Sequence, residues 1–196
     1  MIRIPLIFLL FLLLCSCSQA FYQKVNPVQT TGLDFSKGKW LLGNIEVHAY
    51  VKDELTELVL KDFSEHLKER ISYSLREKSL FLASKIPLNP TKSAILDLKT
   101  GTGYDYYINI KCQDQRSDLS NFDFSAHSYY LKQMTYGRVF MEVYDLNQGI
   151  IVYQQGIDGS MDEDSGLSTR PKRKILLGCY AKLMKDINSR SLGIHH

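Results

Sequence analysis

The chain begins with an apolar run that decides which residues are available to form a folded domain. Residues 4–14 carry no polar side chain, and Arg3 is the single charge before them. A positive residue, then an apolar run of this length, then small residues is the layout of a secretory signal peptide. The run is about half of the roughly 20 residues that a helix needs to span a bilayer. We therefore predict that residues 1–16 are a cleaved signal peptide and not a permanent membrane span.

The residues directly after this run, Leu14, Cys15, Ser16 and Cys17, resemble the lipobox of bacterial lipoproteins. In that family an aliphatic residue and two small residues precede the acylated cysteine. Acylation of Cys17 puts small Ser16 before the cut, whereas acylation of Cys15 would put bulky Leu14 there. The resemblance implies a lipid bilayer anchor at Cys17 and, because Ser18 and not Asp follows, an outer-membrane location. An ordinary secreted protein, cut a few residues later, is the alternative.

The composition is that of a globular protein without a nucleic-acid partner. Hydrophobic residues make up 44% of the chain and charged residues 23%, which lies in the globular range. The 24 basic and 21 acidic residues give a formal charge of +3. This balance does not suit nucleic-acid binding, and the densest basic cluster, residues 170–174, opens an expected helix. We therefore exclude nucleic acid as a partner.

The mature chain is expected to form one domain behind a tether. Residues 17–39 place Gly and Pro among polar residues and follow neither a helix nor a strand period, which predicts a lipidated flexible tether. Such a tether would hold the domain some tens of Å from the membrane. A single globular domain is predicted over 40–190, with a disordered tail over 191–196.

Hydrophobic periodicity predicts an α+β fold. The expected elements are a half-buried strand over 39–50, a long amphipathic helix over 52–79, a short helix over 93–98, a strand over 106–112, hairpin strands over 129–145 and 150–155, and a closing helix over 171–190. Leu58, Phe63, Leu67 and Ile71 form the expected core face of the long helix. We predict a small, mainly antiparallel or mixed sheet with the long helix and the C-terminal helix packed on one face.

The hairpin also carries a resemblance. Residues 137–155 contain an apolar strand, Asp145, the turn Asn147-Gln148-Gly149 and a second apolar strand. This segment resembles the hairpin of small envelope lipoproteins of the curli-secretion and penicillin-binding-protein-activator type, whose elements follow a similar order. The resemblance implies a non-catalytic, protein-binding accessory of an envelope assembly.

The sequence shows no catalytic, metal-binding or cofactor-binding motif. The acidic stretch 158–166 does not match the calcium-loop pattern, so a solvated loop is expected there. The remaining Cys and His residues have no zinc-site spacing, and no nucleophile elbow or phosphate loop is present. A hydrolase stays the third hypothesis, with carboxylates such as Asp105 and Asp145 as the residues to change. We predict neither catalytic residues nor metal ligands nor a cofactor.

Three side chains remain as further candidates. Cys112 and Cys179 either form a disulfide in an oxidising compartment or serve as small buried hydrophobes. Strand alternation places Tyr107 on the sheet face opposite Tyr106, where it is either an exposed interface anchor or covered by a second layer. The leading hypothesis is a module that docks an envelope protein, and the alternative is a surface-displayed lipoprotein that binds an external ligand.

Changing Cys17 tests the anchor. We expect Cys17→Ser to abolish acylation and normal processing, because serine has no thiol to carry the lipid. Cell fractionation and mass spectrometry of the purified protein measure the result. A variant that keeps its normal processing and remains in the membrane fraction would show that the anchor lies elsewhere.

Overall fold

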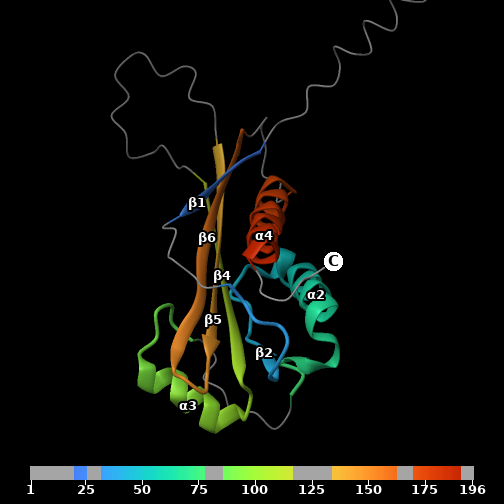
Figure 1. Cartoon of the computed structure of the whole chain (residues 1–196). Helices are drawn as coiled ribbons and strands as arrows, with labels where there is room; N and C mark the ends of the chain where they lie inside the picture. Colours follow the sequence, from blue (N-terminus) through green and yellow to red (C-terminus); the bar gives the residue numbers. More distant parts are fainter. Residues whose placement is uncertain (1–19, 26–31, 78–85, 117–133, 163–169, 191–196) are drawn as a thin grey trace, which may run out of the picture.

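The computed structural model describes residues 20–25, 32–77, 86–116, 134–162 and 170–190 (Figure 1). A six-stranded mixed sheet has the order β1-β6-β5-β4-β2-β3. Its strands are β1 (Phe21–Val25), β2 (Trp40–Leu42), β3 (Ile71–Tyr73), β4 (Tyr106–Arg116), β5 (Met134–Asp145) and β6 (Ile150–Asp162). Strand β2 runs parallel to β3 and β4, and the other pairs are antiparallel. The α+β class and the mixed sheet are as predicted.

Helices cover both faces of this sheet, to different extents. Helices α2 (Ala49–Leu67) and α4 (Arg170–Arg190) pack on one face and bury the larger core. This confirms the predicted placement of the long helix and the C-terminal helix. The shorter α3 (Lys92–Thr102) packs on the opposite face, at the end of the sheet where the β5–β6 hairpin turns, over a smaller core (Figure 1). The other end of that face has no described helix on it.

The long helix ends earlier than the spacing of its apolar residues predicted. Phe63 and Leu67 are fully buried and Leu58 is partly buried, as expected of the core face. Lys68 then adopts φ 55°, which ends the α-helix, and a 3-10 turn follows over Lys68–Arg70. Ile71, predicted on the same helical face, instead begins β3 and pairs with Trp40 of β2. Ending the helix here lets residues 71–73 form β3, which pairs in parallel with β2.

The predicted tether over 17–39 is wrong for its described residues. Residues Phe21–Val25 form the edge strand β1, paired along their whole length with β6. Leu33 and Phe35 are 2% and 6% exposed. The Phe35 ring lies 5.4 Å from the Trp40 ring and stacks at 4.7 Å on His66. These residues belong to the domain because burying their apolar surface outweighs the entropy of a free chain.

Other boundaries also moved. The strand predicted over 39–50 is only Trp40–Leu42, with α2 beginning at Ala49. Strand β6 continues to Asp162, through the first residues of the predicted acidic loop, because β1 pairs with it as far as Ser160 and β5 as far as Asp162. The hairpin turn, the short helix and the closing helix are confirmed within a few residues. The predicted signal peptide 1–16, Cys17 and the tail 191–196 lie outside the described residues.

Phe63→Ala tests the core beneath α2. Because Phe63 is 0% exposed, we expect the free energy of unfolding to fall by about 3–5 kcal/mol, a large part of the stability of an ordinary domain. Exposed Lys61→Ala, two residues earlier on the same helix, is the control and should change little. Thermal denaturation measures both, and equal melting temperatures would contradict the burial.

Candidate binding surface

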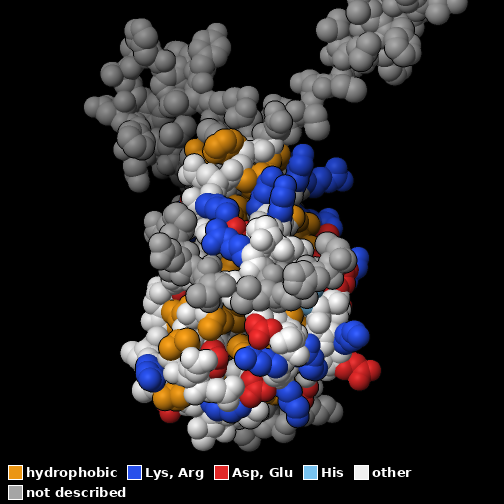
Figure 2. Space-filling model, viewed as in Figure 1, with side chains coloured by type: hydrophobic (Ala, Val, Ile, Leu, Met, Phe, Trp, Pro, Cys, Tyr) orange, Lys and Arg blue, Asp and Glu red, His pale blue; other side chains and the backbone are white. Residues whose placement is uncertain are grey.

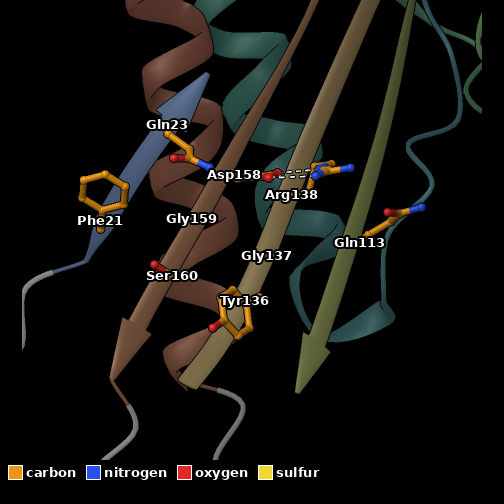
Figure 3. A pocket seen from close by; sticks show the side chains of 9 residues that line it. All are labelled: Phe21, Gln23, Gln113, Tyr136, Gly137, Arg138, Asp158, Gly159 and Ser160. Atoms are coloured by element: carbon orange, nitrogen blue, oxygen red, sulfur yellow. Dashed lines mark hydrogen bonds and ion pairs between the residues drawn. The ribbon is translucent and has the colours of Figure 1, made fainter. Parts of the chain in front are cut away.

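The end of the sheet that α3 leaves uncovered presents one continuous polar and aromatic surface. Along β1, β6, β5 and β4, side chains alternate between the face that carries α4 and the opposite face. A hollow of about 510 Å³ lies on this opposite side, and the close-up in Figure 3 shows it in front of the sheet with the helices behind. We call its side chains the open face: Phe21, Gln23, Gln113, Tyr136, Arg138, Asp158 and Ser160.

Two aromatic side chains mark one row of the open face. In the strand register Phe21 pairs with Ser160, and Ser160 pairs with Tyr136, so the three residues form a line across β1, β6 and β5. Phe21 is 64% exposed and Tyr136 is 42% exposed. Aromatic side chains that keep this much contact with water are enriched where proteins bind other proteins.

The neighbouring row is polar and carries no net charge. Arg138 donates two hydrogen bonds to Asp158, from Nε to Oδ1 and from Nη2 to Oδ2 at 2.7 Å (Figure 3). The hydrogen bond to Asp158 raises the pKa of Arg138. Gln23 pairs with Asp158 in the register and Gln113 pairs with Arg138, so two amides flank the ion pair. The two amides of this row can donate and accept hydrogen bonds with a partner. The charge of the Asp158 carboxylate is already balanced by Arg138.

The other predicted candidates lie elsewhere. Tyr107 is 4% exposed and stacks on Tyr144 beneath α3, with ring centroids 6.0 Å apart. Of the two alternatives for Tyr107 the covered one is correct, and the interface role is withdrawn because α3 packs over this ring. Cys112 and Cys179 are both free thiols, so the disulfide is not formed. Burial raises the pKa of the Cys112 thiol and raises that of Cys179 to about 12.

The two carboxylates singled out in the sequence organise the hairpin end of the fold. Asp145 accepts backbone N–H groups of Asn147 and Gln148, both within its own turn. Asp105 accepts the Nζ of Lys99 at 2.7 Å and the backbone N–H of Lys39 at 2.9 Å. The Lys99 hydrogen bond, followed by that of Lys39, lowers the pKa of Asp105 to about 2. Both acids therefore accept hydrogen bonds that stabilise the fold.

A third carboxylate joins the starts of the two long helices to β4. The side chain of Asp114 is 2% exposed and lies within 3.1 Å of the Nζ of Lys172 and 3.0 Å of the Nε2 of His48. Burial opposes its ionisation, but hydrogen bonds from Tyr50 and Lys172 and nearby positive charge lower the pKa of Asp114 on balance. Within the described residues no group of three or more His, Cys, Asp or Glu side chains could hold a metal ion.

Comparisons with known proteins find similar structures only. No protein-family model matches the chain. No curated protein matches it either. A chlamydial protein, the hypothetical CT253 of Chlamydia trachomatis, is similar at 14% identity and a TM-score of 0.44, over 79% of this chain and 95% of that one. Lipoprotein GNA1162 of Neisseria meningitidis is similar at 10% identity and a TM-score of 0.42, over 76% and 99%.

PelC of Paraburkholderia phytofirmans, a dodecamer, is similar at 9% identity and a TM-score of 0.40, over 83% of this chain and 96% of that one. Similar structures thus include a lipoprotein, but likenesses of this size carry no functional assignment.

Among the described residues, none of the helices is long and apolar enough to cross a bilayer.

Asp105→Asn tests the acid dependence of stability. A carboxyl whose pKa is about 2 when folded and about 3.9 when unfolded stabilises the fold above pH 4 and loses this contribution as the pH falls toward 2. We expect the variant to melt at a lower temperature than the wild type at pH 6, with the difference shrinking at pH 2–3. Thermal scans across this range measure it, and a difference that does not change with pH would contradict the assignment.

Proposed function

We propose that this protein is a lipid-anchored lipoprotein of the bacterial envelope that binds another envelope protein through the open face and catalyses no reaction. The observation that carries the proposal is the exposed aromatic row of Phe21 and Tyr136 beside the Arg138–Asp158 ion pair, which has no net charge. Exposed aromatic area combined with satisfied polar groups suits reversible protein binding.

The anchor is the second part of the proposal. The signal-like run and the lipobox-like residues around Cys17 support acylation there, and Ser18 after it supports the outer membrane. The resemblance of the hairpin to envelope accessory lipoproteins points to the same class of function. Two or more acyl chains on one cysteine would make the attachment stable, since one chain alone is marginal.

A surface-displayed lipoprotein that binds an external small ligand is the second candidate. The hollow of about 510 Å³ favours it, because ligand sites usually measure about 300–1,000 Å³. Its lining is largely polar, however, while ligand sites are usually more apolar, so protein docking is the better fit. Protease treatment of intact cells separates the two candidates, since only a domain displayed outside would be cut.

Tyr136→Ala tests the open face as a docking surface. A photo-crosslinking residue at position 113 should give a discrete adduct with one envelope protein in living cells. Tyr136→Ala should reduce that adduct strongly, since truncating an interface anchor costs about 2 kcal/mol or more of binding. Ile150→Ala is the matched control, because Ile150 is 43% exposed against 42% for Tyr136 but lies at the hairpin turn.

The melting temperature must be measured for both variants, so that lost binding is not mistaken for lost folding. Equal adduct yields from the two variants would reject the open face as the docking surface. A purified domain that turned over a substrate, and lost this activity on changing one carboxylate, would reject the non-catalytic part of the proposal.

A further inference from the structure

The near balance of charge in the whole chain conceals a strong asymmetry between the two long helices. Helix α4 carries seven Lys and Arg residues and a single acid, Asp186. Asp186 is 6% exposed and is bonded to Lys24 and Arg190. The outer side of α4 therefore presents no exposed carboxylate. Helix α2, beside it on the same sheet face, carries five acids and two lysines.

Three exposed lysines form a stripe along α4. At 3.6 residues per turn, Lys174, Lys182 and Lys185 fall within roughly 80° of one another around the helix axis. Figure 2 shows Lys and Arg side chains gathered in the part of the view where α4 lies. With Lys24 of β1 these lysines make up what we call the basic face: Lys24, Lys174, Lys182 and Lys185.

Strand β1 and α4 form this face together. A Cβ at Gly178 would lie 1.9 Å from the hydroxyl of Tyr22, so the glycine lets β1 approach the helix closely. The Nζ of Lys182 lies 5.8 Å from the centre of the Tyr22 ring. Between the two elements is a hollow of about 320 Å³, whose lining includes Lys182, Lys185 and the ion pair of Lys24 with Asp186. The basic face is thus hollowed between β1 and α4, and its exposed lysines can bind anionic groups.

The chain path brings this face to the point of anchoring. Only Ser18, Gln19 and Ala20 separate Cys17 from Phe21, the first residue of β1. An extended chain spans at most about 3.6 Å per residue, so the Cα atoms of Cys17 and Phe21 are at most about 14 Å apart. A helix with its side chains is about 10–12 Å thick, so this length is similar to the thickness of α4.

We infer that the outer side of α4 lies on the membrane, with the basic face against anionic phospholipid headgroups. The inference rests on the proposed anchor at Cys17. Attraction to an anionic lipid surface fades within a Debye length of about 8–10 Å, and so short a link allows the lysines of α4 to lie within this range. Because the open face is on the opposite side of the sheet from α4, this orientation turns the open face away from the bilayer.

The test uses the acylated protein in vesicles. A fluorophore is placed by Ala181→Cys on the exposed side of α4, or by Ser160→Cys on the open face, and quenched by lipids with a nitroxide on the headgroup. Wild type, whose thiols are Cys112 and Cys179, gives the labelling background. With 30% phosphatidylglycerol in phosphatidylcholine, we expect quenching at position 181 to exceed that at position 160 several-fold.

Charge reversal decides whether the lysines cause this orientation. Lys182→Glu with Lys185→Glu should remove the difference between the two positions, as should vesicles of phosphatidylcholine alone. The matched control, Lys37→Glu with Lys92→Glu, changes the net charge equally at exposed lysines outside α4, and Lys92 lies on α3 on the opposite sheet face, so the difference should remain. Stronger quenching at position 160, or no response to Lys182→Glu with Lys185→Glu, would overturn the inference.

The outcomes also separate this inference from the proposed function. Mass spectrometry of the wild type first establishes whether Cys17 is acylated, and its absence would remove the anchor itself. An acylated protein that is quenched at position 160 would keep the anchor and refute only the orientation. Added inorganic phosphate at 10 mM distinguishes a simple anion site, which it would block, from binding to a lipid surface, which it would leave nearly unchanged.

Discussion

The close seating of α4 on the hairpin strands is the contact on which the rest of the molecule depends. Gly137 and Gly159 pair directly across β5 and β6. A Cβ at either glycine would lie 2.7–2.8 Å from the Cγ2 of Ile175, so only glycine allows the helix this near. Once Ile175 and Cys179 are buried there, helical geometry sends the lysines of α4 to the outside. In this position of α4, Gly178 faces β1, and the Tyr22 side chain of β1 packs against it.

The sequence predicted those elements whose periodicity is local and complete. Helix α4 and the β5–β6 hairpin were found because their apolar positions repeat over several turns or strand pairs. The end of α2 was missed because Leu67 and Ile71 keep the helical spacing, while the break at Lys68 is a positive φ without the usual glycine. Strand β1 was missed because its five residues show no alternation, and their partner β6 lies more than 120 residues away.

The surface was harder to predict than the core, for a related reason. Alternation correctly put Tyr107 opposite Tyr106, but only the position of α3 decided that Tyr107 is covered and that Tyr136 is not. The open face combines residues of four strands, and the register that aligns Phe21, Ser160 and Tyr136 is a tertiary property. Overall charge was equally uninformative, since it averages an acidic α2 with a basic α4.

The strand in place of a tether changes what the proposed anchor at Cys17 would do. A flexible segment of some twenty residues would let the domain turn freely, so that no surface would have a preferred direction. With β1 starting four residues after Cys17, the sheet and its helices can adopt few orientations relative to an acylated cysteine. Such restriction favours partner binding, because a surface already held in one direction loses less rotational freedom on association. With the anchor proposed at Cys17, the glycine pair beneath α4 and the exposed row across β1, β6 and β5 would be linked to the membrane through one short connection.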